Sequence, residues 1–171
     1  MSDDSKTSRF DVTGLLEAKS VGRMRSEVTG RMVVGDLDKP MYQFNFEMAT
    51  DEGSFHGGAD SAPPPLAYFC TGLVTCLMTQ IRACSKRLRI DIGDVRVSAR
   101  IKWEGRQSGR DPYTAHPIAF ELDVDLASSA PEADQRRLLD AAQKSCFVEA
   151  TLADPVPVGH RLLIGGNWVE A

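Results

Sequence analysis

The sequence predicts an α+β fold in which antiparallel strands accompany one long apolar helix. Three features indicate this class: strand-like alternation over residues 42–48, a helical apolar stripe over residues 66–88, and two alternating segments within residues 95–126. Strands and helices do not alternate regularly along the chain, as they would in a parallel α/β fold. The length of 171 residues suits one domain, so we expect a single domain over residues 1–171 with a flexible end at residues 1–10.

The first strands are expected before residue 50. Residues 21–34 form a mixed, strand-like segment, and the next segment alternates apolar with polar residues, with Tyr42, Phe44, Phe46 and Met48 on its apolar side. A loop rich in Gly, Ser and Pro follows over residues 50–65. Because Pro suits the first turn of a helix, we expect a helix that begins near Pro65 and ends near Arg87.

Two strands and a second helix are expected after this point. Residues 95–104 carry basic side chains on their polar face and residues 118–126 carry acidic ones, so an antiparallel hairpin would pair opposite charges across the strands. Residues 129–132 (Ser-Ala-Pro-Glu) have the pattern of a capping box, which predicts a second helix that runs to about Ser145. A last short strand is expected over residues 161–164.

Charge and hydropathy exclude several kinds of partner. The net charge is −4, whereas a nucleic-acid surface normally requires a basic excess, so no nucleic-acid partner is expected. No uninterrupted apolar run approaches the roughly 18 residues that span a membrane. Residues 1–9 are polar and charged and lack the apolar core of a secretory signal. We therefore expect a cytoplasmic protein with no membrane partner.

Motif searches predict neither a metal nor a cofactor. His56, His116 and His160 form no pair at metal-ligand spacing, and there is no Cys-x-x-Cys. The Gly-Gly pairs at 57–58 and 165–166 match neither a P-loop nor a dinucleotide fingerprint. His56 precedes the long helix, where it would either assist a cysteine nucleophile and bind substrate or simply be solvated.

The four cysteines fall into different positions on the predicted helices. Cys70 and Cys84 lie within the apolar stripe of the long helix, where a thiol behaves as a small hydrophobe. Cys76 lies on the flank of that helix, in a strip of small side chains that allows either close packing or access to a cavity: Gly72, Thr79 and Ala83. Cys146 lies near the end of the second helix, where it is either a buried thiol or a functional one.

One arrangement of residues resembles the OsmC-like (osmotically inducible protein C) family. It comprises Gly57-Gly58, then Pro65, then Cys76 eleven residues later within an apolar helix. A second family landmark is a cysteine after a later amphipathic helix, which Cys146 matches. The order of strands and helices fits as well, so the resemblance extends over most of the chain.

The resemblance implies an intertwined homodimer with two sites at the subunit interface. It also implies thiol-dependent reduction of a small hydrophobic peroxide, with a dithiol as reductant. Cys76 would be the attacking thiolate, and Cys146 would convert its sulfenic acid into a disulfide. Such a pair is chemically sensible, because only a thiolate attacks well and a second thiol traps the sulfenic acid before further oxidation.

The sequence departs from the peroxidase members at three positions. An acid that follows the Pro is replaced by Leu66, an Arg nine residues before the Pro is replaced by His56, and the usual Cys-Pro is Cys146-Phe147. Neutral His supplies less positive charge than Arg to lower the pKa of a thiol. Three other residues are candidates to replace the missing acid–Arg pair: Glu52, Asp60 and Arg82.

Two alternative functions remain open. The fold would retain its dimer and apolar cavity to bind a small hydrophobic ligand without peroxidase activity, which the missing acid–Arg pair favours. A hot-dog-type acyl-thioester enzyme also wraps a sheet around a long helix, but no catalytic carboxylate is clearly placed for it. One uninterrupted sheet around the helix at Pro65 would favour that fold.

Overall fold

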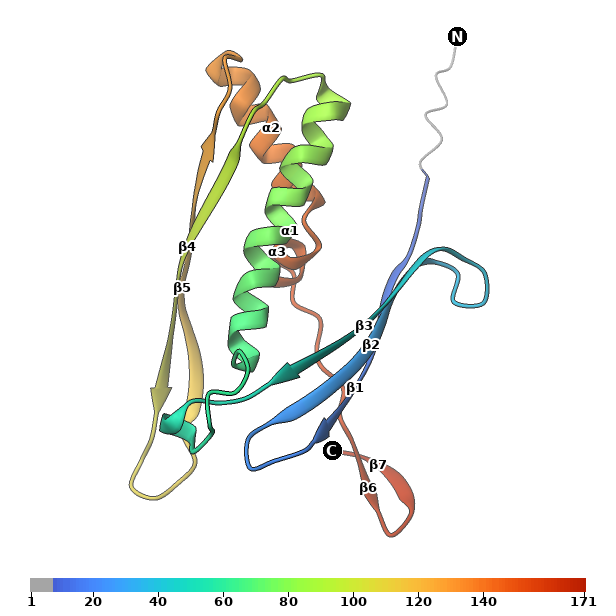
Figure 1. Cartoon of the computed structure of the whole chain (residues 1–171), viewed down its shortest axis with the longest axis vertical. Helices are drawn as coiled ribbons and strands as arrows, with labels where there is room; N and C mark the ends of the chain where they lie inside the picture. Colours follow the sequence, from blue (N-terminus) through green and yellow to red (C-terminus); the bar gives the residue numbers. More distant parts are fainter. Residues whose placement is uncertain (1–7) are drawn as a thin grey trace. The chain divides into compact units, whose positions relative to one another are not determined.

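The computed structural model describes residues 8–171 (Figure 1). Its elements belong to two compact units, of which the first ends at Tyr68 and the second runs from Phe69 to Ala171. Helices and antiparallel sheets confirm the predicted α+β class. The expected flexible end lies mostly outside the described residues, and a single functional domain stays a prediction.

The first unit contains a three-stranded antiparallel sheet in the order β1-β2-β3. The strands are β1 (Val12–Ser20), β2 (Ser26–Gly35) and β3 (Pro40–Thr50). The predicted strand-like segment over residues 21–34 is confirmed as β2 from Ser26 onward, whereas residues 21–25 form the turn before it, and β1 was not predicted. Gly14 interrupts the apolar alternation of β1, which hides this strand in the sequence.

One face of this sheet is almost entirely apolar. The strand register aligns Leu16 with Gly30 and Gly30 with Phe46, and the rows on either side are apolar as well. Tyr42 and Phe44 on this face are 60% and 55% exposed. We name this surface the apolar sheet face, and its members are Val12, Gly14, Leu16, Ala18, Val28, Gly30, Met32, Val34, Tyr42, Phe44, Phe46 and Met48. Antiparallel sheets normally pack such a face against another surface.

The long helix α1 (Pro65–Leu88) begins and ends close to the predicted residues. Leu73, Leu77, Ile81 and Cys84 are buried, as the stripe predicted, whereas Leu66 is 50% exposed. By length and composition α1 is apolar enough to cross a membrane, which the search for uninterrupted apolar runs missed. The core helix of a soluble protein has the same properties, so this finding is weak evidence for a membrane span.

The strands β4 (Val95–Arg106) and β5 (Thr114–Leu126) form the predicted antiparallel hairpin. Its charges meet as expected: the Arg100 guanidinium donates to Glu121 at 3.1 Å and to Asp123 at 2.6 Å. These side chains are well exposed, so solvent screens the pairs and they contribute little to stability.

The second helix, α2 (Glu132–Ser145), ends where the sequence predicted. The predicted capping box was wrong, because the N-cap is Pro131 and no side chain caps the helix. Pro131 instead accepts backbone hydrogen bonds from Asp134 and Gln135 through its carbonyl group. A third helix that the sequence did not reveal, α3 (Phe147–Ala153), follows directly after Cys146.

The chain ends in a two-stranded hairpin of β6 (Arg161–Ile164) and β7 (Asn167–Glu170). The strand over residues 161–164 was predicted, but β7 was not. Gly165 and Gly166 both have positive φ in the tight turn between the strands, which is the two-residue turn that joins hairpin strands. Apolar side chains of this hairpin are more than 40% exposed: Leu162, Leu163, Ile164, Trp168 and Val169.

The core of the second unit lies where α1, α2 and the β4–β5 hairpin meet. Leu77 and Ile81 of α1 pack in one buried cluster with Val95 of β4 and Leu138 of α2. Figure 1 shows the hairpin along one side of α1. The three sheets of the described chain are separate, which counts against the single wrapped sheet of a hot-dog fold.

Candidate functional site

The second unit brings Cys76 and Cys146 together. Cys146 is fully buried in the core cluster, and Cys76 is a half-buried residue of α1 that packs against it. The two thiols are neighbours, and the proximity of Cys76 raises the pKa of the Cys146 thiol. Both are free thiols. The fold thus places close together two cysteines that are 70 residues apart in sequence (76 to 146).

The break between α2 and α3 positions Cys146. Its backbone is extended (φ −81°, ψ 110°), which ends α2, and its carbonyl accepts the N–H of Ala150 at 2.9 Å to begin α3. The sulfur therefore lies at the junction of two helices and not on a regular helical face. Phe147, in place of the family's Pro, still permits this break.

Burial raises the pKa of the Cys146 thiol to about 11. The backbone N–H groups of Glu149 and Val148 lower it in part because they favour the thiolate, whereas Cys76 raises it further. Cys146 is therefore protonated near neutral pH and is a poor first nucleophile. Cys76 is the more exposed member of the pair.

A groove of about 400 Å³ lies in the same unit as this pair, and we name it the α1–β5 groove. Its first two walls are apolar and come from α1 and β5: Leu73, Leu77, Phe120, Leu122 and Val124. Its third wall comes from α2 and α3: Leu139, Gln143, Glu149, Leu152 and Ala153. Leu77 follows Cys76 directly on α1, and α3 follows directly after Cys146, so each cysteine is next in sequence to an element that lines the groove.

The first unit holds the loop of His56 in a fixed shape through a buried carboxylate. Asp51 is 2% exposed, and its oxygens accept hydrogen bonds from the Ser61 hydroxyl at 2.7 Å and from the N–H groups of Ser61, Glu52 and Ala59. These bonds, the Ser61 hydroxyl above all, lower the pKa of Asp51. The loop is therefore ordered by one side chain that sequence reasoning did not single out.

His56 ends a 3₁₀ turn (Ser54–His56) in this loop and is exposed. Its Nδ1 lies 3.2 Å from Glu52 Oε2. Gly57 follows with a left-handed φ of 78°, a conformation that favours glycine. Gly58 also needs to be glycine, because a Cβ there would overlap the carbonyl group of Glu52.

Two arginines approach the same loop from the turn between β1 and β2. The Arg23 guanidinium lies beside Gly57, where an added Cβ would be 3.2 Å from its Cζ. Arg25 Nη1 donates to the Ser61 hydroxyl at 2.7 Å. The loop therefore has guanidinium groups although His56 occupies the family's Arg position. No spacing in the sequence links residues 23–25 to residues 57–61, so these neighbours were not predictable.

The remaining candidates lie elsewhere. Cys84 is buried, with its sulfur 3.8 Å from the Ser145 hydroxyl, and Cys70 is half-buried. Arg82 is exposed and lines a separate hollow near the end of α1, and Asp60 is exposed with a φ of 54°. Within residues 8–171, no group of three or more His, Cys, Asp or Glu is arranged to hold a metal ion.

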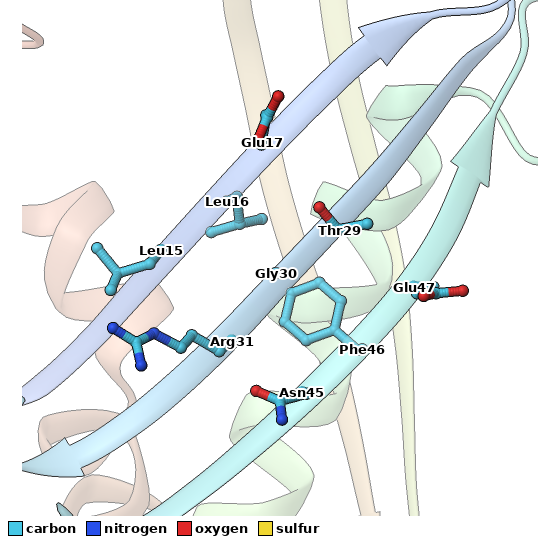
Figure 2. Close-up of a pocket in the computed structure, with 9 residues that line it drawn as sticks. All are labelled: Leu15, Leu16, Glu17, Thr29, Gly30, Arg31, Asn45, Phe46 and Glu47. Carbon is cyan, nitrogen blue, oxygen red and sulfur yellow. The ribbon is translucent and has the colours of Figure 1, made fainter.

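A larger hollow of about 690 Å³ lies on the three-stranded sheet (Figure 2). Phe46 lies over Gly30, where a Cβ would be 2.6 Å from its ring, and Leu16 flanks the pair. The hollow also has three charged residues at its edges: Glu17, Arg31 and Glu47. It contains no cysteine and none of the sequence-predicted site residues, so it is not the candidate site.

Comparison with known proteins agrees with this arrangement. The family model described as OsmC-like protein matches residues 57–161. The crystal structure of an OsmC-like hydroperoxide resistance protein from Jannaschia sp. CCS1 is 40% identical to this chain, with a TM-score of 0.62, and the match covers 95% of this chain and 99% of that one.

More distant structures share the fold. An organic hydroperoxide resistance protein from Elizabethkingia anophelis is 19% identical over 87% of this chain and 92% of its own, with a TM-score of 0.55. One from Legionella pneumophila is 16% identical over 83% and 90%, with a TM-score of 0.52. A search of curated proteins gives no match. The model match over more than half of the chain and the 40% identity over nearly all of it show that this protein belongs to the OsmC-like protein family.

Proposed function

We propose that the protein reduces small organic hydroperoxides through Cys76 and Cys146. The observation that supports this most strongly is that Cys76 and Cys146 are neighbours at one core cluster. The name of the Jannaschia relative, a hydroperoxide resistance protein, agrees with this activity.

The proposed reaction balances as two thiol steps. The Cys76 thiolate attacks the terminal oxygen of the hydroperoxide, the O–O bond breaks, and the alkoxide takes up a proton and leaves as the alcohol. Cys76 is then a sulfenic acid. Cys146 attacks its sulfur, water leaves with the Cys146 proton, and a disulfide forms. An external dithiol reduces this disulfide by exchange, which restores both thiols.

Peptide mapping by mass spectrometry after treatment of the reduced protein with cumene hydroperoxide tests the proposal. We expect a stoichiometric Cys76–Cys146 disulfide at low peroxide, loss of the disulfide in Cys146→Ser, and stepwise over-oxidation of Cys76 in that variant. Cys70→Ser is the matched control and should behave as the unsubstituted protein. Two thiols that stay reduced, or oxidation spread over all four cysteines, would reject this function.

The second candidate function is binding of a small hydrophobic ligand without turnover. Leu66 in place of the family's acid and the apolar lining of the groove favour it. Thermal stabilisation by an apolar ligand, with both thiols unreactive toward cumene hydroperoxide, is the result that would establish it.

We also propose that the protein acts as a homodimer. The apolar sheet face and the apolar side chains of the β6–β7 hairpin are well exposed in the single chain. An isolated two-stranded hairpin is marginally stable in water, so a second subunit that covers these surfaces would stabilise both. The expected cytoplasmic location stays a prediction.

A further inference from the structure

One carboxyl group stands out in the wall of the α1–β5 groove. Glu149 is the only titratable side chain among the residues that line it, and no Lys, Arg or His joins it there. The side chain is half-buried, and no hydrogen bond or ion pair joins its carboxylate to any other residue in the described part of the chain. Burial raises the pKa of Glu149, as expected for a carboxyl among apolar neighbours.

Glu149 is close in sequence to one thiol of the pair, because α3 follows directly after Cys146. Glu149 lies in the first turn of α3, and its backbone N–H faces the Cys146 sulfur. Across the groove, Leu73 and Leu77 are one helical turn before and one residue after Cys76 on α1. A molecule in the groove meets an apolar wall on one side and the Glu149 carboxyl on the other.

We propose that Glu149 makes the α1–β5 groove selective for uncharged apolar molecules and excludes those that carry an acid group. An anion in the groove would be repelled by the Glu149 carboxylate and would lose hydration without finding a cation to pair with. An uncharged molecule is neither repelled by the carboxylate nor stripped of the hydration of a charge. The substrate class that follows rests on the proposed function. The protein would reduce small neutral alkyl or aryl hydroperoxides and not fatty-acid hydroperoxides.

A matched pair of fluorescent probes tests the selectivity without any turnover. N-phenylnaphthylamine is neutral, and anilinonaphthalene sulfonate adds a permanent negative charge to a similar apolar body. Both are titrated into the full-length reduced protein at about pH 8, well above the ordinary pKa of Glu. Ala153 lies at the exposed rim of the groove, and Ala153→Trp would fill the groove with an indole ring. The part of the probe fluorescence that this variant removes therefore comes from probe bound in the groove.

We expect the groove of the unsubstituted protein to bind the neutral probe at least on the order of tenfold more tightly than the anionic one. Glu149→Gln should reduce the preference for the neutral probe, and Glu149→Lys should make the anionic probe bind more tightly than the neutral one. Glu132→Gln is the control, since Glu132 is an exposed residue of α2 outside the groove. Glu132→Gln removes one negative charge from the protein and should leave the ratio of the two probe affinities unchanged.

Three binding results would overturn the inference. They are equal binding of both probes, a ratio that Glu149→Lys does not change, and neutral-probe binding that Ala153→Trp leaves intact. A change of oligomeric state in Ala153→Trp would show that a second copy of the chain occupies the groove, and it would also overturn the inference. The test is separable from the peroxidase proposal, because probe selectivity is measured whether or not a Cys76–Cys146 disulfide forms.

Discussion

At the scale of single residues, burial decides the chemistry of the thiol pair. The same packing that fixes Cys146 among Leu138 and Ala142 also keeps it protonated. Such a thiol is a poor first nucleophile toward peroxide. In the proposed reaction Cys146 would therefore act second, by attacking the sulfenic acid of Cys76, which orders the two steps.

The raised pKa of Cys146 makes a prediction about stability at alkaline pH. Between its ordinary pKa of 9.0 and about 11, the folded protein retains a proton that the unfolded chain releases. The free energy of unfolding should therefore be unaffected below pH 9.0 and should fall above it by up to about 1.4 kcal/mol per pH unit. Urea denaturation of the reduced protein at several pH values measures this slope.

Cys146→Ala should lack this contribution to the slope, although its stability at neutral pH is also lower. Cys84→Ala is the control, because it removes a buried thiol from the same cluster and leaves Cys146 in place. Parallel curves for Cys146→Ala and the unsubstituted protein would show that the buried thiol is not the cause.

At the scale of elements, long periodic segments were predictable and short or interrupted ones were not. The period of α1 and the alternation of β3, β4 and β5 are local properties of the chain, so the sequence revealed them. Glycine hid β1, and seven residues are too few for α3 to show helical periodicity. The Gly165-Gly166 turn was a usable signal for β7.

The candidate site was predictable in its residues but not in its surroundings. Helical position alone left Cys76 and Cys146 open between packing and function, and the family resemblance selected them. Arg23 beside Gly57 and the α1–β5 groove around Glu149 depend on contacts between segments far apart in sequence. Such contacts follow from the tertiary fold, and no local sequence pattern predicts them.

The apolar stripe of α1 predicts a large difference between two identical substitutions. Leu77 is 1% exposed within the core cluster, so Leu77→Ala should reduce the free energy of unfolding by about 2–5 kcal/mol. Leu66→Ala on the same helix removes the same atoms at a half-exposed position and should cost less than about 1 kcal/mol. Chemical denaturation of both variants measures the difference, and equal costs would contradict the burial of the stripe.

At the scale of the whole molecule, exposed apolar surface indicates assembly. The apolar sheet face in the first unit and the β6–β7 hairpin in the second both present large side chains to solvent in the single chain. A soluble monomer rarely exposes surfaces of this size. We infer that the functional form covers them, and a homodimer does so with one interface repeated by symmetry.

Charge on the apolar sheet face should therefore disrupt the proposed dimer. Phe44→Glu places a carboxylate on that face, where a dimer would bury it without a partner, and should shift the protein to monomers. Gln43→Glu adds the same charge one residue earlier on the opposite face and should leave the dimer intact. Sedimentation velocity measures both, with circular dichroism to verify folding. A monomeric unsubstituted protein, or a dimeric Phe44→Glu, would contradict the proposal.

The junction at Cys146 has a consequence for how redox state and ligand binding influence each other. The sulfur lies where α2 stops and α3 starts, and α3 supplies Glu149, Leu152 and Ala153 to the groove. A disulfide at this sulfur that displaced the first turn of α3 would displace that wall as well. Thermodynamic reciprocity then requires the converse: a ligand that holds α3 in its reduced position makes the cysteine pair harder to oxidise. The midpoint potential of the pair thus becomes a measure of groove occupancy.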